Sequence, residues 1–229
     1  MADEAWIFPP ADTADEHGIV GVGADLKPKT IISAYTQGLF PMPLKRNGPI
    51  GWWSPDPRAV IPLDGLHISR TLRRSMKRFH FTVNTAFSDV IDACADESRP
   101  HGWIDSQVRH GYTELHRLGW AHSIETRNDD GELVGGVYGV GIRGLFAGES
   151  MFHTETDASK AALVHTVELL QNFGAQLFDV QWLTPHLSTL GAIDLSRTDY
   201  LRRLERALEV HDKAGFVPST RSAFSEGTP

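Results

Sequence analysis

The sequence predicts an α+β protein in which helices flank a sheet, preceded by a small N-terminal domain. From residue 67 onward, apolar residues recur with helical spacing in some segments and strand spacing in others. The run "NDDG" at 128–131 is typical of a hairpin turn between two strands. Residues 1–66 are instead rich in Pro and Gly. These observations favour a small domain at 1–66 and a larger domain at 67–229.

The small domain is expected to contain one helix, at 26–38. Ile31 and Tyr35 would share its buried face, and Gly38 would end it. The segment 39–60 holds five prolines among Trp and Phe residues. We expect no regular element there, only a rigid wall lined by aromatic side chains.

The larger domain is predicted to follow one order of helices and strands. Thr85 and Asp157 are the candidate N-caps of two of its helices. The predicted order is helix 67–79, strand 79–84, helices 85–96 and 106–119, strand 121–128, two strands within 132–152, helix 157–174, strand 175–183 and helix 197–210.

Composition excludes several classes of protein. The net charge of -7 argues against a surface that is coated by nucleic acid, although a local basic patch could still bind it. Cys94 is the single cysteine, so neither an intramolecular disulfide nor a Cys-based zinc site can form. The eleven histidines form no H-E-x-x-H motif, so no metal is expected. No signal peptide or membrane-spanning run is apparent, which fits a cytoplasmic protein.

Three glycines, Gly139, Gly141 and Gly144, form a G-x-G-x-x-G pattern. A dinucleotide-binding turn needs a helix that opens directly after it, but the apolar run "LFAGESMF" follows. We therefore expect bulges or close backbone approaches in adjacent strands. Ser150 lacks the second glycine of a hydrolase elbow and is interpreted as a hydrogen-bonding group.

Three polar residues within apolar strands are candidates for a site. Glu149 requires a cation or a hydrogen-bond donor, either in a structural ion pair or from a substrate amine. Asp179 and Gln181 project from one face of their strand, because alternate residues share a face. They form either a satisfied core network or a functional site.

A basic segment lies at the start of the larger domain. Its spacing places most of its cations on one helical face, which is typical of either a solvated face or a phosphate-binding surface. The residues are Arg70, Arg73, Arg74, Lys77 and Arg78. The element order also resembles that of CoA-dependent acetyltransferases, but "QNFGAQ" at 171–176 departs from their pyrophosphate-binding loop. Acetyl transfer and a non-catalytic tRNA-binding module therefore remain alternative functions.

Several rare strings, in order, resemble the leucyl/phenylalanyl-tRNA–protein transferase family over about residues 8–208. They include "WWSPDPRAV", "LHISR", "LHRLGWAHSIE", "LVGGVYGV", "FAGESMF", "ASKAAL" and "DVQ". The resemblance implies an acetyltransferase-like (GNAT-like) fold without a cofactor. It also implies transfer of Leu or Phe, and less readily Met, from aminoacyl-tRNA to proteins that begin with Arg or Lys, in the N-degron pathway.

The resemblance also implies roles for individual residues. Asp179 and Gln181 match the family's catalytic pair, and Glu149 matches its pocket glutamate. The basic residues at 70–78 would contact the acceptor stem of tRNA. The apolar pocket for the aminoacyl side chain would comprise Trp103, Tyr112, Phe146 and Met151, together with Met42 and Phe178. Met42 replaces a tryptophan common in the family and Phe178 a small aliphatic residue, which leaves the donor preference open.

Overall fold

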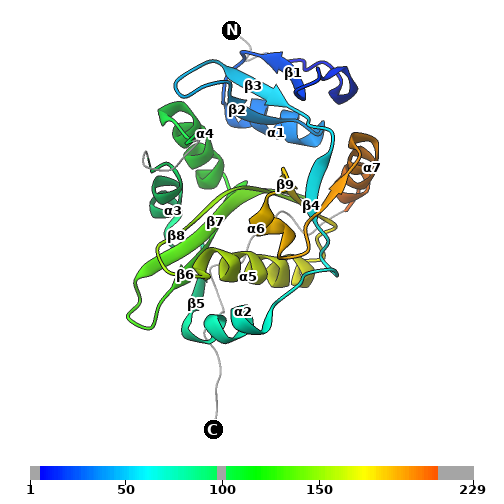
Figure 1. Ribbon diagram of the computed structural model, residues 1–229. Helices are drawn as coiled ribbons and strands as arrows, with labels where there is room; N and C mark the ends of the chain where they lie inside the picture. The colour runs from blue at the N-terminus through cyan, green and yellow to red at the C-terminus, as the bar shows by residue number, and fades with distance from the viewer. Residues whose placement is uncertain (1–5, 97–101, 211–229) are drawn as a thin grey trace.

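A computed structural model describes residues 6–96 and 102–210. It contains two sheets, one small and one large (Figure 1). The small antiparallel sheet has the order β1-β3-β2, and helix α1 (Pro28–Thr36) packs on it. Its strands are β1 (Ile19–Val22), β2 (Phe40–Pro43) and β3 (Ile50–Trp53). A 3-10 turn, η1 (Ala11–Thr13), precedes them.

The large sheet has seven strands in the order β10-β4-β9-β8-β7-β6-β5. All neighbouring pairs are antiparallel except β8 and β9, which run parallel. The strands are β4 (Arg58–Ile61), β5 (His80–Val83), β6 (Ala121–Arg127), β7 (Leu133–Ile142), β8 (Leu145–His153), β9 (Leu177–Gln181) and β10 (Ile193–Leu195). The predicted mixed sheet with flanking helices is confirmed.

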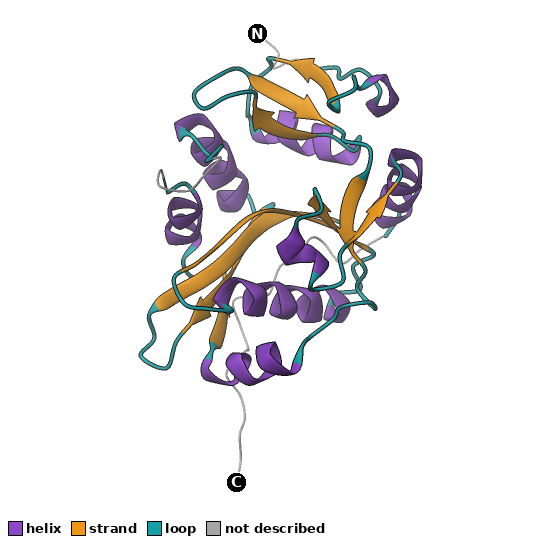
Figure 2. Cartoon of the chain, viewed as in Figure 1, coloured by secondary structure: helices purple, strands orange, loops and turns teal. Residues whose placement is uncertain are grey.

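Helices cover both faces of the large sheet (Figure 2). On one face pack α3 (Phe87–Cys94) and α4 (Ser106–Arg117), and on the other α2 (Arg70–Ser75) and α5 (Ala158–Asn172). The remaining helical elements are η2 (Met76–Arg78), α6 (Pro185–Ser188) and α7 (Arg197–Leu208). Buried residues of α3 and α4 form one core cluster together with Tyr35, Trp52 and Tyr200. The small sheet and the large sheet therefore share this hydrophobic core.

The prediction that 39–60 forms no regular element is wrong, because β2, β3 and the start of β4 lie there. Pro41 and Pro43 lie on β2, which pairs only with β3 and is therefore an edge strand. An edge strand has one side without ladder hydrogen bonds, where the missing N–H of proline costs nothing. Strand β4 lies before residue 67 but pairs with β9 and β10 of the large sheet. The domain boundary between residues 66 and 67 remains a prediction.

The structure confirms one predicted helix end and contradicts two predicted side-chain caps. Gly38 has a φ of +82° and follows Gln37, the C-cap of α1, as expected of a helix stop. Thr85 does not cap α3: its hydroxyl donates to Glu125, which also accepts the N–H of the N-cap residue Ala86. Asp157 occupies the N-cap position of α5, but its side chain accepts from Ser75 and does not cap. The predicted helix 67–79 is shorter, comprising α2 followed by η2.

The G-x-G-x-x-G pattern opens no helix, as predicted. Gly139 and Gly141 lie within β7, and Gly144 lies in the turn to β8. A Cβ on Gly139 would lie only 2.3 Å from the carbonyl oxygen of Ala147, so the neighbouring strand requires a glycine here.

Candidate active site

A β-bulge places Glu149 apart from its neighbours on β8. Tyr138 of β7 pairs with Ser150 and Gly139 pairs with Gly148, so Glu149 is the extra residue. Parallel pairing of β8 with β9 ends at Ala147, before Glu149 is reached. The carboxyl group therefore lies where two parallel strands separate.

Hydroxyl and amide groups surround the Glu149 carboxyl group. The Tyr35 hydroxyl lies 2.5 Å from its Oε1, and the Tyr112 hydroxyl lies 2.8 Å from its Oε2. The Gln181 Nε2 lies 3.2 Å from Oε1, and the two tyrosine hydroxyls lie 2.7 Å apart. Glu149 is only 8% exposed, so this polar cluster is enclosed by the core.

Burial raises the pKa of Glu149 to about 7, against the hydrogen bonds from Tyr35 and Tyr112, which lower it. Burial and the charge of Glu149 raise the pKa of both tyrosines well above the usual value, so both hydroxyls stay protonated donors. Near neutral pH, Glu149 can therefore exist in either charge state. A carboxyl group in this condition is typical of functional sites.

Asp179 lies close to this cluster but has different partners. Its Oδ1 accepts from the Arg58 Nε at 2.9 Å, and its Oδ2 accepts from the Arg58 Nη2 at 2.6 Å. The Tyr200 hydroxyl donates to Oδ2 at 2.9 Å, and the backbone N–H of Gln181 donates to Oδ1 at 2.9 Å. Both Asp179 and Arg58 are buried. Asp179 thus belongs to a satisfied buried network, one of the two alternatives that the sequence left open.

The other residues predicted for the site fall into two groups. Tyr112 contacts Glu149 directly, and Trp103 and Met42 pack against the core that contains Tyr112. Phe146 and Phe178 are buried in a different core cluster, which also contains residues of α5, with ring centroids 5.6 Å apart. Met151 packs against that same core. The structure does not bring all six into one cluster, and their role in an aminoacyl pocket stays a prediction.

The basic residues of α2 and η2 lie away from Glu149. All five predicted tRNA contacts are exposed, and Arg78 also pairs with Glu155 at 3.8 Å. In Figure 1, α2 lies at the bottom of the view and the small sheet at the top, with the large sheet between them. Their role in binding tRNA stays a prediction.

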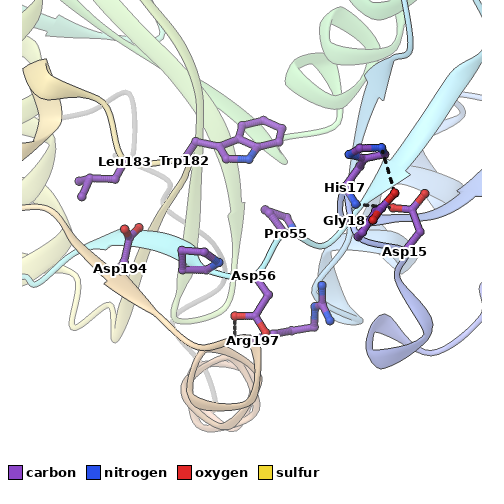
Figure 3. A pocket seen from close by; sticks show the side chains of 11 residues that line it. Asp15, His17, Gly18, Pro55, Asp56, Trp182, Leu183, Asp194 and Arg197 are labelled. Atoms are coloured by element: carbon purple, nitrogen blue, oxygen red, sulfur yellow. Dashed lines mark hydrogen bonds and ion pairs between the residues drawn. The ribbon is translucent and has the colours of Figure 1, made fainter.

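A pocket of about 450 Å³ opens beside Trp182, the residue after Gln181 (Figure 3). It contains four carboxylate side chains, an indole, an imidazole and a guanidinium group. These belong to Asp15, Glu16, Asp56, Asp194, Trp182, His17 and Arg197. The Arg197 guanidinium donates twice to the carbonyl oxygen of Ser54, at 2.9 and 2.7 Å. Carboxylates therefore outnumber the cationic groups in the lining of the pocket.

Sequence reasoning missed these carboxylates, and it missed Tyr35, Arg58 and Tyr200. One signal was present: Arg58 opens the apolar strand segment "RAVI", and a buried arginine requires an anionic partner. Among the described residues, no group of three or more His, Cys, Asp or Glu side chains could hold a metal ion. None of the helices in the described ranges has both the length and the apolar character needed to cross a membrane.

A titratable carboxyl group buried beside an amide, where two strands separate, marks a candidate functional site. The sequence profile of leucyl/phenylalanyl-tRNA protein transferase matches residues 60–205, and that of its N-terminal domain matches residues 24–56. These matches make the chain an aminoacyltransferase. It belongs to the leucyl/phenylalanyl-tRNA protein transferase family.

Individual relatives carry the same name over nearly their whole length. The leucyl/phenylalanyl-tRNA–protein transferase of Nitratidesulfovibrio vulgaris (strain DP4) is 43% identical, over 94% of this chain and 93% of its own. That of Legionella pneumophila (strain Corby) is 42% identical, over 93% of this chain and 96% of its own. That of Syntrophobacter fumaroxidans is 47% identical, over 88% of this chain and 87% of its own.

Proposed function

We propose that the protein transfers leucine or phenylalanine, and methionine less efficiently, from aminoacyl-tRNA to the N-terminus of proteins that begin with Arg or Lys. The observation that carries this proposal is the buried Glu149, held by Tyr35, Tyr112 and Gln181 in a chain of this family. The products enter the N-degron pathway of protein degradation, and we expect the reaction in the cytoplasm, where aminoacyl-tRNA occurs.

The reaction requires little acid–base catalysis. The aminoacyl ester is already activated, and the acceptor α-amine, with a pKa of about 7.7–8.0, is partly neutral near ambient pH. Positioning of the amine against the ester carbon therefore contributes most of the rate. The Gln181 Nε2 donates to Glu149, which leaves the Gln181 carbonyl oxygen to accept an N–H of the attacking amine. In this proposal Glu149 binds the amino group of the aminoacyl donor.

The proposal also includes the fold class and the pocket for the side chain of the aminoacyl donor. An acetyltransferase-like fold is supported by the single parallel pair, β8 and β9, within an otherwise antiparallel sheet. The apolar residues around the strand opening would accept side chains that are unbranched at Cβ. They would exclude polar side chains, whose desolvation would not be compensated.

The acidic pocket supports the preference for Arg or Lys at the acceptor N-terminus. It begins one residue after Gln181, so an acceptor whose α-amine meets Gln181 can extend its first side chain toward it. Carboxylates such as Asp194 and Glu16 attract a guanidinium or ammonium group, and the indole of Trp182 can stack on one. A neutral side chain would gain neither interaction.

The transfer itself is tested with purified protein. Labelled Phe-tRNA or Leu-tRNA is incubated with a peptide that begins with Arg, and label in the peptide is measured. We expect transfer by the wild type and a large loss in Gln181→Ala. If the wild type transfers no label, the proposed activity is wrong.

The acceptor pocket is tested with Asp194→Asn combined with Glu16→Gln. Neither carboxylate accepts a backbone hydrogen bond among those described, so the fold should tolerate the changes. We expect the KM for an Arg-initiated peptide to rise about tenfold, the effect of about 1.4 kcal/mol, with kcat unchanged. Glu205→Gln, an exposed carboxylate on α7, is the matched control and should leave KM unchanged. An unaltered KM in the double variant would contradict the assignment.

A further inference from the structure

A tight turn sets the direction in which Trp182 leaves strand β9. Gln181 has a φ of +66°, in the left-handed region, and the Trp182 N–H donates to the carbonyl oxygen of Val180 at 2.8 Å. A hydrogen bond between residues i and i+2 closes a γ-turn, and the form with a positive φ is rare and strained. The strand therefore ends at Gln181, and the turn fixes the position of the next side chain, the indole of Trp182.

Aromatic side chains of the small sheet hold this indole. Its ring centroid lies 5.0 Å from that of Phe40 on β2, at an interplanar angle of 85°, and 6.1 Å from that of Trp53 on β3, at 73°. The Trp53 Nε1 in turn donates to the carbonyl oxygen of Met42 at 2.9 Å. These edge-to-face contacts restrict the indole, yet 36% of Trp182 is exposed. A fixed aromatic surface therefore stays open to solvent next to Gln181.

The exposed indole borders the acidic pocket, and Figure 3 shows Asp194 on one side of it and His17 on the other. Asp194 on β10 is in register with Ala59 of β4, which is in register with Gln181. Neighbouring strands lie about 4.8 Å apart, so Asp194 lies about 10 Å across the sheet from Gln181. The Asp194 side chain has no hydrogen bond or ion pair within the described part of the chain. Its charge is therefore available to a cation in the pocket.

An arginine side chain fits an indole beside carboxylates better than a lysine side chain does. The guanidinium group is planar and weakly hydrated, so it stacks on an aromatic face while its N–H groups remain directed outward. The ammonium group of lysine is compact and strongly hydrated, and it gains mainly the attraction of the carboxylates. The carboxylates therefore attract both cations, whereas the indole distinguishes between them.

We propose that Trp182 determines specificity for the first residue of the acceptor, by stacking on its side chain and favouring Arg over Lys. The inference rests on the proposed transferase function. It assigns to one residue a choice that the carboxylates of the pocket do not make. Trp182 contacts the side chain of the acceptor and not the reacting atoms, so its effect is confined to the comparison between acceptors.

The test compares two peptides that differ only in Arg or Lys as the first residue. Transfer of labelled Phe to each is measured as kcat/KM for the wild type, Trp182→Leu and Trp182→Phe. We expect the wild type to prefer the Arg peptide and Trp182→Leu to lower the ratio of the two values about fivefold, the equivalent of about 1 kcal/mol. Trp182→Phe retains a smaller ring and should lower the ratio about twofold. The ratio is taken within one preparation, so partial loss of folded protein does not alter it.

Trp120→Leu is the matched control. Trp120 is 37% exposed, lies between α4 and β6 and is not part of the pocket lining, so its replacement should leave the ratio unchanged. Equal use of both peptides by the wild type, or an unchanged ratio in Trp182→Leu, would overturn the proposal. In the second case Trp182 would serve only to pack against Phe40 and Trp53. Transfer to neither peptide by the wild type would instead contradict the proposed function, so the two failures are distinguishable.

Discussion

Replacement of Glu149 by glutamine should change how the stability of the protein depends on pH. The folded protein holds this carboxyl group with a pKa of about 7, against 4.5 in the unfolded chain. Between these values the folded state binds more protons than the unfolded state, so the free energy of unfolding falls as pH rises through this window. One pKa unit corresponds to about 1.4 kcal/mol, so ionisation of Glu149 costs the folded protein about 3 kcal/mol above pH 7. The penalty is absent below the unfolded pKa.

Glu149→Gln retains the shape of the side chain and cannot ionise. Its changed hydrogen bonds to Tyr35 and Tyr112 add an offset that does not depend on pH. The difference in unfolding free energy between variant and wild type should therefore increase by about 3 kcal/mol from pH 4.5 to above pH 7, in favour of the variant. Urea denaturation at several pH values, followed by tryptophan fluorescence, measures this difference. Glu205→Gln is the exposed control, and a flat difference for Glu149→Gln would refute the reasoning.

Two further predictions concern the tRNA surface and the strand glycines. Arg73→Glu combined with Arg74→Glu should weaken tRNA binding and reduce the slope of log affinity against log salt by about 2, one for each lost phosphate contact. An unchanged slope in a filter-binding titration would place the tRNA elsewhere. Gly139→Ala should destabilise the fold by about 2–3 kcal/mol, because its Cβ would meet the Ala147 carbonyl oxygen at 2.3 Å. Gly21→Ala, which meets no atom within 4 Å, is the thermal-denaturation control and should lose far less.

Local sequence patterns were sufficient to predict most of the helices and strands. The hairpin signal at 128–131 and the helix stop at Gly38 depend only on nearby residues, and both predictions are confirmed. The strand at Pro41 and Pro43 was missed because tolerance of proline depends on whether a strand lies at an edge, which is a property of the sheet. Short elements such as β1, β10 and α6 carry too few residues for a periodic signal.

In the site too, local sequence patterns could be read, whereas contacts between residues far apart in the sequence could not be predicted. Alternation along β9 predicted that Asp179 and Gln181 share one face, and in the structure both side chains hydrogen-bond buried polar partners. The partner of Asp179 is Arg58, 121 residues earlier, and pairing over that separation is fixed only when β4 lies beside β9. The left-handed backbone of Gln181 could not be predicted either, since glutamine has no preference for it and the surrounding contacts impose it.

These long-range contacts bring the N-terminal segment against the proposed site. Tyr35 comes from α1 and reaches Glu149, 114 residues later, while Phe40 of β2 covers Arg58. Without α1, Glu149 would lose its shortest hydrogen bond and part of the core that excludes water from it. Its pKa would then fall toward the ordinary value, because burial is the largest cause of the rise. The large sheet supplies Glu149 and Gln181, but the protonation state of Glu149 near neutral pH depends on the N-terminal segment that packs over it.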